Sequence, residues 1–237
     1  MIAEGNNMYT GDEYLGKNPD YHLEDAGWKA GLILGMMNKN KVFPKGIADL
    51  GCGAGGVIKQ MARVMSSSVC FYGYDISPKA IDLARQSANE KNVHFQTGNY
   101  FENPRQSVDL ILVIDLLEHL DNFYLFLREL KLCGSKCIFH IPLDLSGRSI
   151  LKPHILKQQR ESVGHIHYFS REMVWWLLED CGFVIRDWRF TKPVSDVTNR
   201  PTVMRSIKKF LRNISFRLNP DLSSKLWGDY SVLIFAE

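Results

Sequence analysis

The sequence has few cysteines, and none of them stands in a C-x-x-C pair. Without such pairs, neither a thiol-based zinc site nor a redox motif is indicated. An odd, scattered set of thiols is typical of a reducing compartment, where cysteine acts as a small core residue. The set consists of Cys52, Cys70, Cys133, Cys137 and Cys181.

Long apolar runs and a targeting segment are also missing. The N-terminus has no basic start followed by an apolar stretch, so no signal peptide is predicted. The longest apolar run, Leu110–Leu117, is interrupted by Asp115 and is far shorter than the roughly 20 residues that span a bilayer. We therefore expect a soluble, cytoplasmic protein.

A large excess of one charge sign is lacking as well. The formal net charge of +3 over 237 residues does not by itself indicate a nucleic-acid partner. Hydrophobic residues make up 45% of the chain and charged residues 23%, which is ordinary for a globular protein with a full core. The length allows one large α/β domain or two small ones.

From residue 47 onward, short strand-like runs alternate with helical patterns. The run 108–114 is almost continuously apolar, as expected of a strand buried on both faces. Ser77 and Pro78 predict the start of one helix, and Ser170 and Gly182 predict the cap and the end of another. This alternation predicts an open, mostly parallel seven-stranded α/β sheet with helices on both faces. The predicted strands are 47–50, 69–76, 93–96, 108–114, 136–143, 183–190 and 231–236.

Two segments lie outside this alternation. Residues 1–40 are predicted to form an N-terminal helical arm, which either covers the mouth of the sheet or packs on its outside. Residues 41–237 form the main domain, with a basic insert, 191–229, before the last strand. Within it, 200–220 holds six lysines and arginines, no acid, and apolar residues at helical spacing. We expect this amphipathic helix to be a lid or a homodimer contact, or else a peripheral contact with an anionic membrane.

The glycine-rich stretch ADLGCGAGG, residues 48–56, follows the first predicted strand and precedes a helix. In an open α/β sheet, such a turn lies at the carboxyl ends of the strands, where ligands bind. Glycine allows close backbone approach, and the helix N-terminus adds free N–H donors. Gly51 and Gly53 fit two patterns: G-x-G-x-x-G with Gly56, which is typical of dinucleotide sites, and G-x-G-x-G with Gly55.

Asp49 and the string DLGCGAG resemble motif I of the class I S-adenosylmethionine-dependent methyltransferases, whose fold is Rossmann-like. That cofactor has an amino-acid end and no phosphate. A carboxylate at Asp49 can therefore help to organise a site for its ammonium group, whereas beside a pyrophosphate it is repulsive. Asp75, about 20 residues further on, can accept both ribose hydroxyls of a nucleoside. The alternative is that Asp75 only caps the next helix.

Two more segments extend the resemblance. In TGNYFE, family members often carry an aspartate where Asn99 stands; its amide oxygen can still accept a hydrogen bond from adenine, and a surface turn is the alternative. In VIDLLEHLDN, the resemblance places Asp115, Leu116 and His119 at the cofactor and acceptor pocket, although Glu118 and His119 also suit the end of a helix. The cofactor contacts that the resemblance implies are Asp49, Gly51, Cys52, Gly53, Gly55, Asp75, Ile76, Asn99, Tyr100, Asp115 and Leu116.

Methyl transfer from a sulfonium needs alignment and a dry pocket, and a base where the acceptor must lose a proton. Histidine suits that role near neutral pH. The segment ESVGHIHYFS offers His165 and His167, whose rings face the same side of an extended chain. His119 is the competing base. No third ligand with convincing spacing is visible, so no metal is expected. Lys29 is expected to be solvated, or to reach the cofactor carboxylate.

These features predict an S-adenosylmethionine-dependent methyltransferase that yields S-adenosylhomocysteine. The expected acceptor atom is an oxygen or nitrogen of a small molecule, or of a saccharide carried on a lipid or nucleotide. No N/D-P-P-Y/F string follows the fourth predicted strand, which argues against a nucleic-acid methyltransferase. An NAD-dependent oxidoreductase and a non-catalytic protein that binds the cofactor or a nucleoside are the alternatives.

Overall fold

A seven-stranded sheet organises the chain. The computed structural model describes residues 23–102, 108–134, 136–191 and 203–237, so that 1–22 of the predicted arm and 192–202 of the predicted insert lie outside the described residues. The strand order is β3-β2-β1-β4-β5-β7-β6. Strands β1 to β5 are parallel, and β7 runs antiparallel between β5 and β6. The strands are β1 Gly46–Leu50, β2 Cys70–Asp75, β3 Val93–Thr97, β4 Leu110–Ile114, β5 Lys136–Leu143, β6 Ile185–Thr191 and β7 Tyr230–Ala236.

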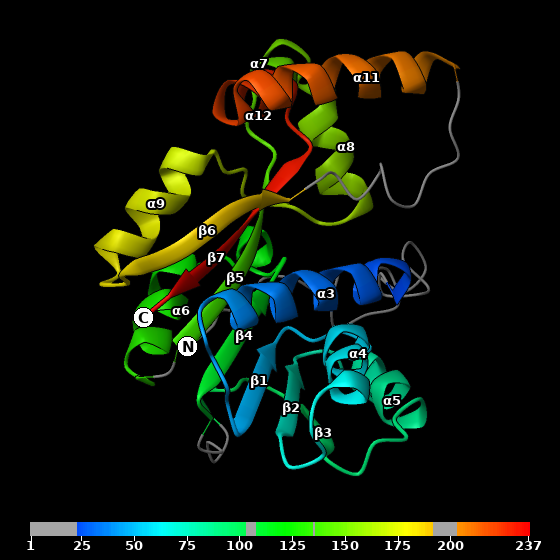
Figure 1. Ribbon diagram of the computed structural model, residues 1–237, viewed down its shortest axis with the longest axis vertical. Coiled ribbons are helices and arrows are strands. Elements are labelled where there is room, and N and C mark those ends of the chain that lie inside the picture. Colours follow the sequence, from blue (N-terminus) through cyan, green and yellow to red (C-terminus); the bar gives the residue numbers. More distant parts are fainter. Residues whose placement is uncertain (1–22, 103–107, 135, 192–202) are drawn as a thin grey trace.

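Helices cover both faces of the sheet (Figure 1). The sheet is therefore the mostly parallel, Rossmann-like one that the sequence predicts. The longer helices of the two layers are α3 Leu23–Lys39, α4 Gly56–Val64, α5 Pro78–Gln86, α6 Phe123–Lys131 and α9 Arg171–Asp180. A second group lies together at one end of the molecule, drawn at the top of Figure 1: α7 Gly147–Leu151, α8 His154–Ser162, α11 Val203–Leu218 and α12 Pro220–Trp227. A short 3-10 turn, η1 Leu117–His119, follows β4.

The central strands are buried on both faces because successive side chains point to opposite sides. In β4, Leu110 and Leu112 belong to one core cluster, while Ile111 and Val113 belong to the other. The first cluster also takes in buried residues of α3, α4 and α5. The second takes in residues of α6 and α9. An apolar run without alternation is therefore what a strand between two helical layers requires.

Polar caps begin several helices as their sequences predict. The Ser77 side chain accepts a hydrogen bond from the backbone N–H of Ala80, and Pro78 occupies the first turn of α5. Ser170 accepts from the N–H of Met173 at the start of α9. These caps satisfy backbone donors that would otherwise lack a partner in the first turn, and they place each helix start directly after a strand or loop.

The basic segment forms the predicted helix, and several apolar side chains between residues 210 and 218 are partly or largely exposed. Phe210 is 63% exposed and Leu218 is 82% exposed, with Leu211 and Ile214 also exposed. Phe216 instead stacks on Tyr230, with ring centroids 4.9 Å apart. Among the described residues, no helix combines the length and apolar character needed to cross a membrane.

Candidate active site

The turn after β1 has a backbone conformation that glycine tolerates better than other residues. Gly51, Gly53 and Gly55 have φ of 73°, 53° and 71°, in the left-handed region that favours glycine. The backbone N–H groups of Gly51 and Cys52 donate to the carbonyl of Tyr74 at 2.8 and 3.0 Å. The turn is thus fixed to the end of β2.

Close packing adds a second reason for glycine in this turn. A Cβ at Gly51 would lie 2.7 Å from Cδ1 of Leu116, and a Cβ at Gly55 would overlap the ring of Phe95. Gly55 also precedes α4 without any side-chain cap. The first N–H groups of α4 are therefore not used by a side chain of their own helix cap, which suits a ligand at this edge.

Asp75 joins the glycine turn to the start of α5. Its Oδ2 accepts from the N–H of Gly53 at 2.8 Å, and its Oδ1 accepts from the N–H of Ser77 at 2.8 Å. The helix-capping alternative is thus present in the structure. A carboxylate oxygen can accept more than one hydrogen bond, so both oxygens keep capacity for a ligand. Burial raises the pKa of the Asp75 carboxyl, against the effect of the two N–H donors.

Asp49 is 3% exposed although it carries a carboxyl group. Burial, and then the neighbouring Asp75, raise the pKa of Asp49 to about 8, while Lys29 acts in the opposite direction. Burial and Asp75 likewise raise the pKa of the Cys52 thiol well above its ordinary value. Two carboxyl groups, those of Asp49 and Asp75, therefore lie at the edge formed by β1 and β2. A cation bound beside them would reduce their mutual repulsion.

The remaining predicted cofactor contacts differ in exposure. Ile76 follows Asp75 and is 52% exposed. The Asn99 side-chain oxygen accepts from the N–H of Phe101 at 3.1 Å, which is the turn that the sequence left as an alternative. Tyr100 is 4% exposed and packs edge-on against Tyr74. Ile76 thus offers apolar surface at the edge, whereas the Tyr100 ring contributes mainly to the core.

Asp115 connects α3 to the sheet through a buried ion-pair network. Its Oδ2 lies 2.7 Å from Nζ of Lys29, which also lies 2.9 Å from Oδ2 of Asp25. Its Oδ1 lies 2.6 Å from Nδ1 of His140, and Nε2 of that ring lies 3.0 Å from Oγ1 of Thr191. The network extends from the N-terminal helix to β6.

The expectation of a solvated Lys29 was wrong. Its side chain is only 11% exposed. Burial opposes the positive charge, but Asp115 and Asp25 outweigh it and raise the pKa of the Lys29 ammonium. In turn, burial is outweighed by His140 and Lys29, which hold the pKa of Asp115 well below its usual range. Lys29 therefore stabilises the ionised carboxylate of Asp115, which follows β4.

Two of the predicted histidines meet beside a glutamate that the sequence analysis did not select. Nε2 of His119 lies 3.9 Å from Oε1 of Glu118, and Nε2 of His165 lies 4.0 Å from the same oxygen. The two rings meet edge to face, with centroids 5.0 Å apart. Glu118 is completely buried. Burial, followed by Asp115, raises the pKa of its carboxyl well above the ordinary value.

His167 lies in different surroundings from His165. Its ring packs edge-on against Phe123 at 4.7 Å and lies 6.5 Å from the ring of Phe169. Nε2 of His167 is buried and makes no hydrogen bond to the described residues. The alternation of an extended chain predicted a shared side, but the two rings have separate partners.

The sequence analysis did not select Asp144, and it considered Glu118 only together with His119. Asp144 follows β5, and its Oδ2 lies 2.6 Å from Nδ1 of His165. Both acids are charged residues next to strands that end at the ligand-binding edge, and that position is the signal that could have identified them. The pairing with His165 joins segments 21 residues apart in the chain, which periodicity does not indicate.

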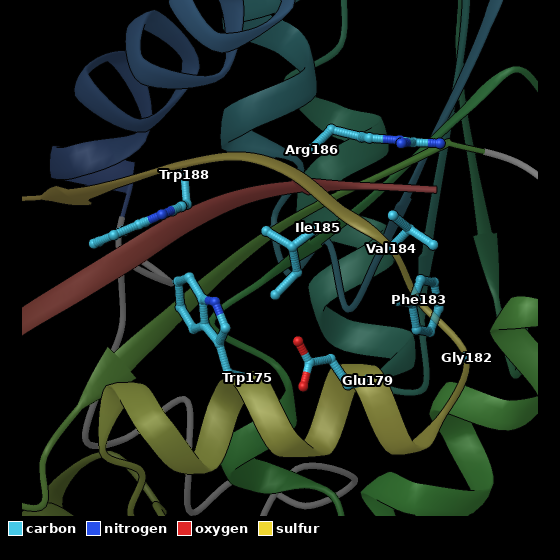
Figure 2. Close-up of a pocket in the computed structure, with 8 residues that line it drawn as sticks. All are labelled: Trp175, Glu179, Gly182, Phe183, Val184, Ile185, Arg186 and Trp188. Atoms are coloured by element: carbon cyan, nitrogen blue, oxygen red, sulfur yellow. The ribbon is translucent and has the colours of Figure 1, made fainter.

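A separate hollow of about 650 Å³ lies between α9 and the edge strand β6. Figure 2 shows Trp175 and Glu179 on α9 facing Ile185, with Trp188 further along β6. None of the predicted cofactor or catalytic residues lines it. It is therefore distinct from the edge formed by the ends of β1, β2 and β4.

A mostly parallel sheet with a glycine turn at the carboxyl ends of its strands is typical of α/β domains that bind a nucleotide or nucleoside at that edge. Residues 45–159 match a family model described as "Methyltransferase domain". The chain is 31% identical over 122 residues to ajmaline N-methyltransferase of Rauvolfia serpentina. The aligned stretch covers 46% of this chain and 41% of that protein. The matched stretches span 31–41% of the lengths of the curated relatives.

Solved structures agree on the fold. One similar structure is a chain from a solved complex between a Haloferax volcanii methyltransferase activator and a methyltransferase. Its TM-score is 0.65 at 15% identity, and the match covers 95% of this chain and 96% of that one. It also resembles magnesium protoporphyrin IX methyltransferase of Synechocystis PCC 6803 with bound S-adenosylhomocysteine, with a TM-score of 0.58, 17% identity, and coverage of 89% and 82%. The chain is thus similar in sequence to a methyltransferase domain over residues 45–159 and shares the fold of solved methyltransferases, one of which contains S-adenosylhomocysteine.

Proposed function

We propose that this chain binds S-adenosylmethionine at the carboxyl ends of β1 and β2 and transfers its methyl group to an oxygen or nitrogen acceptor. The observation that carries the proposal is the turn of Gly51, Gly53 and Gly55, hydrogen-bonded to Asp75 through the N–H of Gly53. Any side chain at Gly51 or Gly55 would collide with Leu116 or Phe95. Glycine is therefore required here by packing as well as by the left-handed backbone, and the turn keeps its main chain at the edge where ligands bind in such sheets.

The described residues fit the chemical groups of this cofactor. Each oxygen of Asp75 accepts one N–H and has a lone pair left for a ribose hydroxyl. The exposed aliphatic side chain of Ile76 offers a surface for the adenine ring. The buried carboxyl groups of Asp49 and Asp75 favour the ammonium group of the amino-acid end. Asn99 is a weaker contact, because Phe101 already occupies one lone pair of its amide oxygen.

The same residues argue against a dinucleotide. A pyrophosphate would place negative charge next to Asp49 and Asp75, whose carboxyl groups already repel each other. Burial and Asp75 raise the pKa of Asp49 to about 8, so negative charge is already opposed at this edge, and a pyrophosphate would add to it, whereas an ammonium group would favour the ionised carboxylate. An NAD-dependent oxidoreductase is therefore the second choice.

Methyl transfer mainly requires that the acceptor atom is aligned with the carbon–sulfur bond in a site that excludes water. The acceptor oxygen or nitrogen forms a bond to the methyl carbon while the carbon–sulfur bond breaks, and the electron pair stays on sulfur. An acceptor that carries a proton gives it to a base. His119 and His165, beside the end of β4, are better placed for this than His167, which packs against Phe123 and has Phe169 nearby.

For the acceptor we propose a small molecule or a saccharide held on a carrier. The exposed apolar side chains Phe210, Leu211, Ile214 and Leu218 of α11 support a further contact, either with a second copy of the chain or with an anionic membrane. Sedimentation at several protein concentrations and flotation with anionic liposomes separate the two. A monomer that does not float would remove both.

Calorimetry and a labelled methyl donor test the proposed function. We expect the full chain to bind S-adenosylmethionine and S-adenosylhomocysteine and not NAD, and to label at least one pool among cell-envelope sugars, phenols and amines. Binding of NAD alone would replace the proposal by an oxidoreductase. Binding of the sulfonium cofactor without labelling of any acceptor would favour a non-catalytic binding protein.

A further inference from the structure

Glu118 is a buried acid without a hydrogen bond. Its side chain is fully inaccessible to solvent, and neither carboxylate oxygen makes a hydrogen bond within the described residues. Buried carboxylates are ordinarily paired with a cation, hydrogen-bonded or bound to a metal, because an isolated one loses its hydration without compensation. The position of Glu118 therefore calls for a partner of positive charge.

Two imidazole nitrogens face the same carboxylate. Nε2 of His119 and Nε2 of His165 lie 3.9 and 4.0 Å from Oε1 of Glu118. These separations are too long for hydrogen bonds. The three ligand atoms all lie within 4.8 Å of one another, so that they surround a single point.

The other nitrogen of each ring is engaged with an acceptor. Nδ1 of His165 lies 2.6 Å from Oδ2 of Asp144, and Nδ1 of His119 lies 3.2 Å from the carbonyl oxygen of Gly164. A carboxylate and a carbonyl only accept, so each Nδ1 carries the proton and donates it. In the neutral rings, each Nε2 then has a lone pair on the side of Glu118, and a cation held there would favour the ionised Glu118 carboxylate, so that two nitrogens and one oxygen can bind the same ion.

Asp144 is itself held in place. Its Oδ1 accepts from Nε2 of Gln159 at 2.7 Å, and its side chain is 5% exposed. A carboxylate that accepts from the second nitrogen of a histidine fixes the orientation and tautomer of a metal-binding ring. His165 and Asp144 have this arrangement.

We propose that Glu118, His119 and His165 bind one divalent transition-metal ion of the zinc class. Two imidazoles and one carboxylate form a donor set that suits zinc, and three protein ligands leave at least one coordination position open. Bond lengths of about 2.0–2.2 Å place tetrahedral ligand atoms roughly 3.3 Å apart. The pairs at 3.9 and 4.0 Å therefore close by less than an ångström around the ion.

The ligands of the proposed metal site come from two separate segments of the chain, so sequence spacing did not indicate them. The two histidines that stand together in the chain, His165 and His167, do not form it. The ligands come from η1 after β4 and from the segment before α9, and Glu118 supplies the third ligand that spacing did not reveal. His119 and His165 hold the ion when it is bound, and in the metal-free chain they are the bases that the proposed function names.

Metal content tests this proposal independently of methyl transfer, because neither the cofactor nor an acceptor is needed. The full chain is stripped with a chelator, titrated with Zn²⁺ in a metal buffer, and titrated with Co²⁺ to record the visible spectrum. We expect one equivalent of tightly bound Zn²⁺ per chain. His165→Gln and His119→Gln weaken binding at least 100-fold, and Asp144→Asn weakens it about 10–100-fold. His154→Gln, an exposed histidine outside the cluster, leaves it unchanged.

X-ray absorption of the zinc-loaded wild-type chain provides a measurement that needs no variant. Two imidazoles and oxygen ligands are expected around the ion. No stoichiometric binding, sulfur ligands from a cysteine, or equal affinity in the His165→Gln and His154→Gln chains would overturn the proposal. Circular dichroism of each variant verifies folding. Calorimetry with S-adenosylhomocysteine on the same samples shows separately whether the cofactor site is intact.

Discussion

Lys29→Met removes the only cation that contacts Asp25 among the described residues, and it keeps most of the aliphatic side chain. Nζ of Lys29 lies 2.9 Å from Asp25 and 2.7 Å from Asp115, in a side chain that is 11% exposed. After the change, Asp115 retains His140, while Asp25 stays buried with one oxygen that already lacks a hydrogen bond. Breaking a buried pair in this way destabilises a protein by about 3–5 kcal/mol.

Lys39→Met is the matched control in the same helix. Nζ of Lys39 lies 2.7 Å from Oδ1 of Asp187, but the lysine side chain is 69% exposed. Exposed pairs contribute about 0–1 kcal/mol. We therefore expect the free energy of unfolding to fall several times more in Lys29→Met than in Lys39→Met, although the two ion-pair distances are nearly equal.

Urea denaturation at pH 7, followed by circular dichroism, measures both changes. Adding Asp25→Asn to the Lys29→Met chain should recover part of the loss, because it removes the carboxylate left without a cation. Similar losses in the two lysine variants would refute the reasoning, since burial would then not determine the strength of the pair. No recovery in the double variant would show that Asp25 is not the source of the loss.

Three further changes probe the turn and its acids. Asp75→Ala should weaken S-adenosylmethionine binding by about two to four orders of magnitude, because two hydrogen bonds to a charged group are lost at about 1.5–3 kcal/mol each. Calorimetry measures the affinity, with Asp82→Ala, at an exposed residue, as the control. Unchanged affinity in Asp75→Ala would reject the ribose assignment. The raised pKa of Asp49, about 8, means that its stabilising contribution is complete below its ordinary value of 3.8 and is lost as the pH rises through 8. Asp49→Asn should therefore become more stable relative to the wild-type chain between pH 5 and pH 9 in urea titrations without cofactor, and a constant difference would contradict the shift. Gly55→Ala should cost about 2–5 kcal/mol of unfolding free energy, from left-handed backbone strain and overlap with a neighbouring ring; Gly134→Ala, with φ of 69° and open space around it, should cost only about 1–2 kcal/mol, and equal costs would exclude the packing contribution.

Local signals in the sequence were enough to predict the sheet and its turns. The apolar run of β4 indicated a strand covered on both faces, and Ser77 with Pro78 indicated the start of α5. The glycines after β1 tolerate left-handed backbone, and Gly51, Gly53 and Gly55 adopt it. Each of these features depends on residues close together in the chain, where periodicity and capping chemistry act directly.

The side-chain partners of the site could not be predicted in the same way. Lys29 was expected to be solvated because that is the commoner case for a lysine on a helix, yet it meets Asp115 after β4. Glu118 resembles an ordinary acid at a helix end, and only the approach of His165 to the same point gives it a role. Such contacts are set by the order of strands in the sheet and not by local pattern.

A crystal structure of the full chain with S-adenosylhomocysteine tests the central claim most directly. The account predicts both ribose hydroxyls within about 2.6–3.0 Å of the Asp75 carboxylate, and the amino-acid end of the ligand over the turn from Gly51 to Gly55. A ligand bound elsewhere, or one that leaves Asp75 in contact only with Gly53 and Ser77, would contradict it.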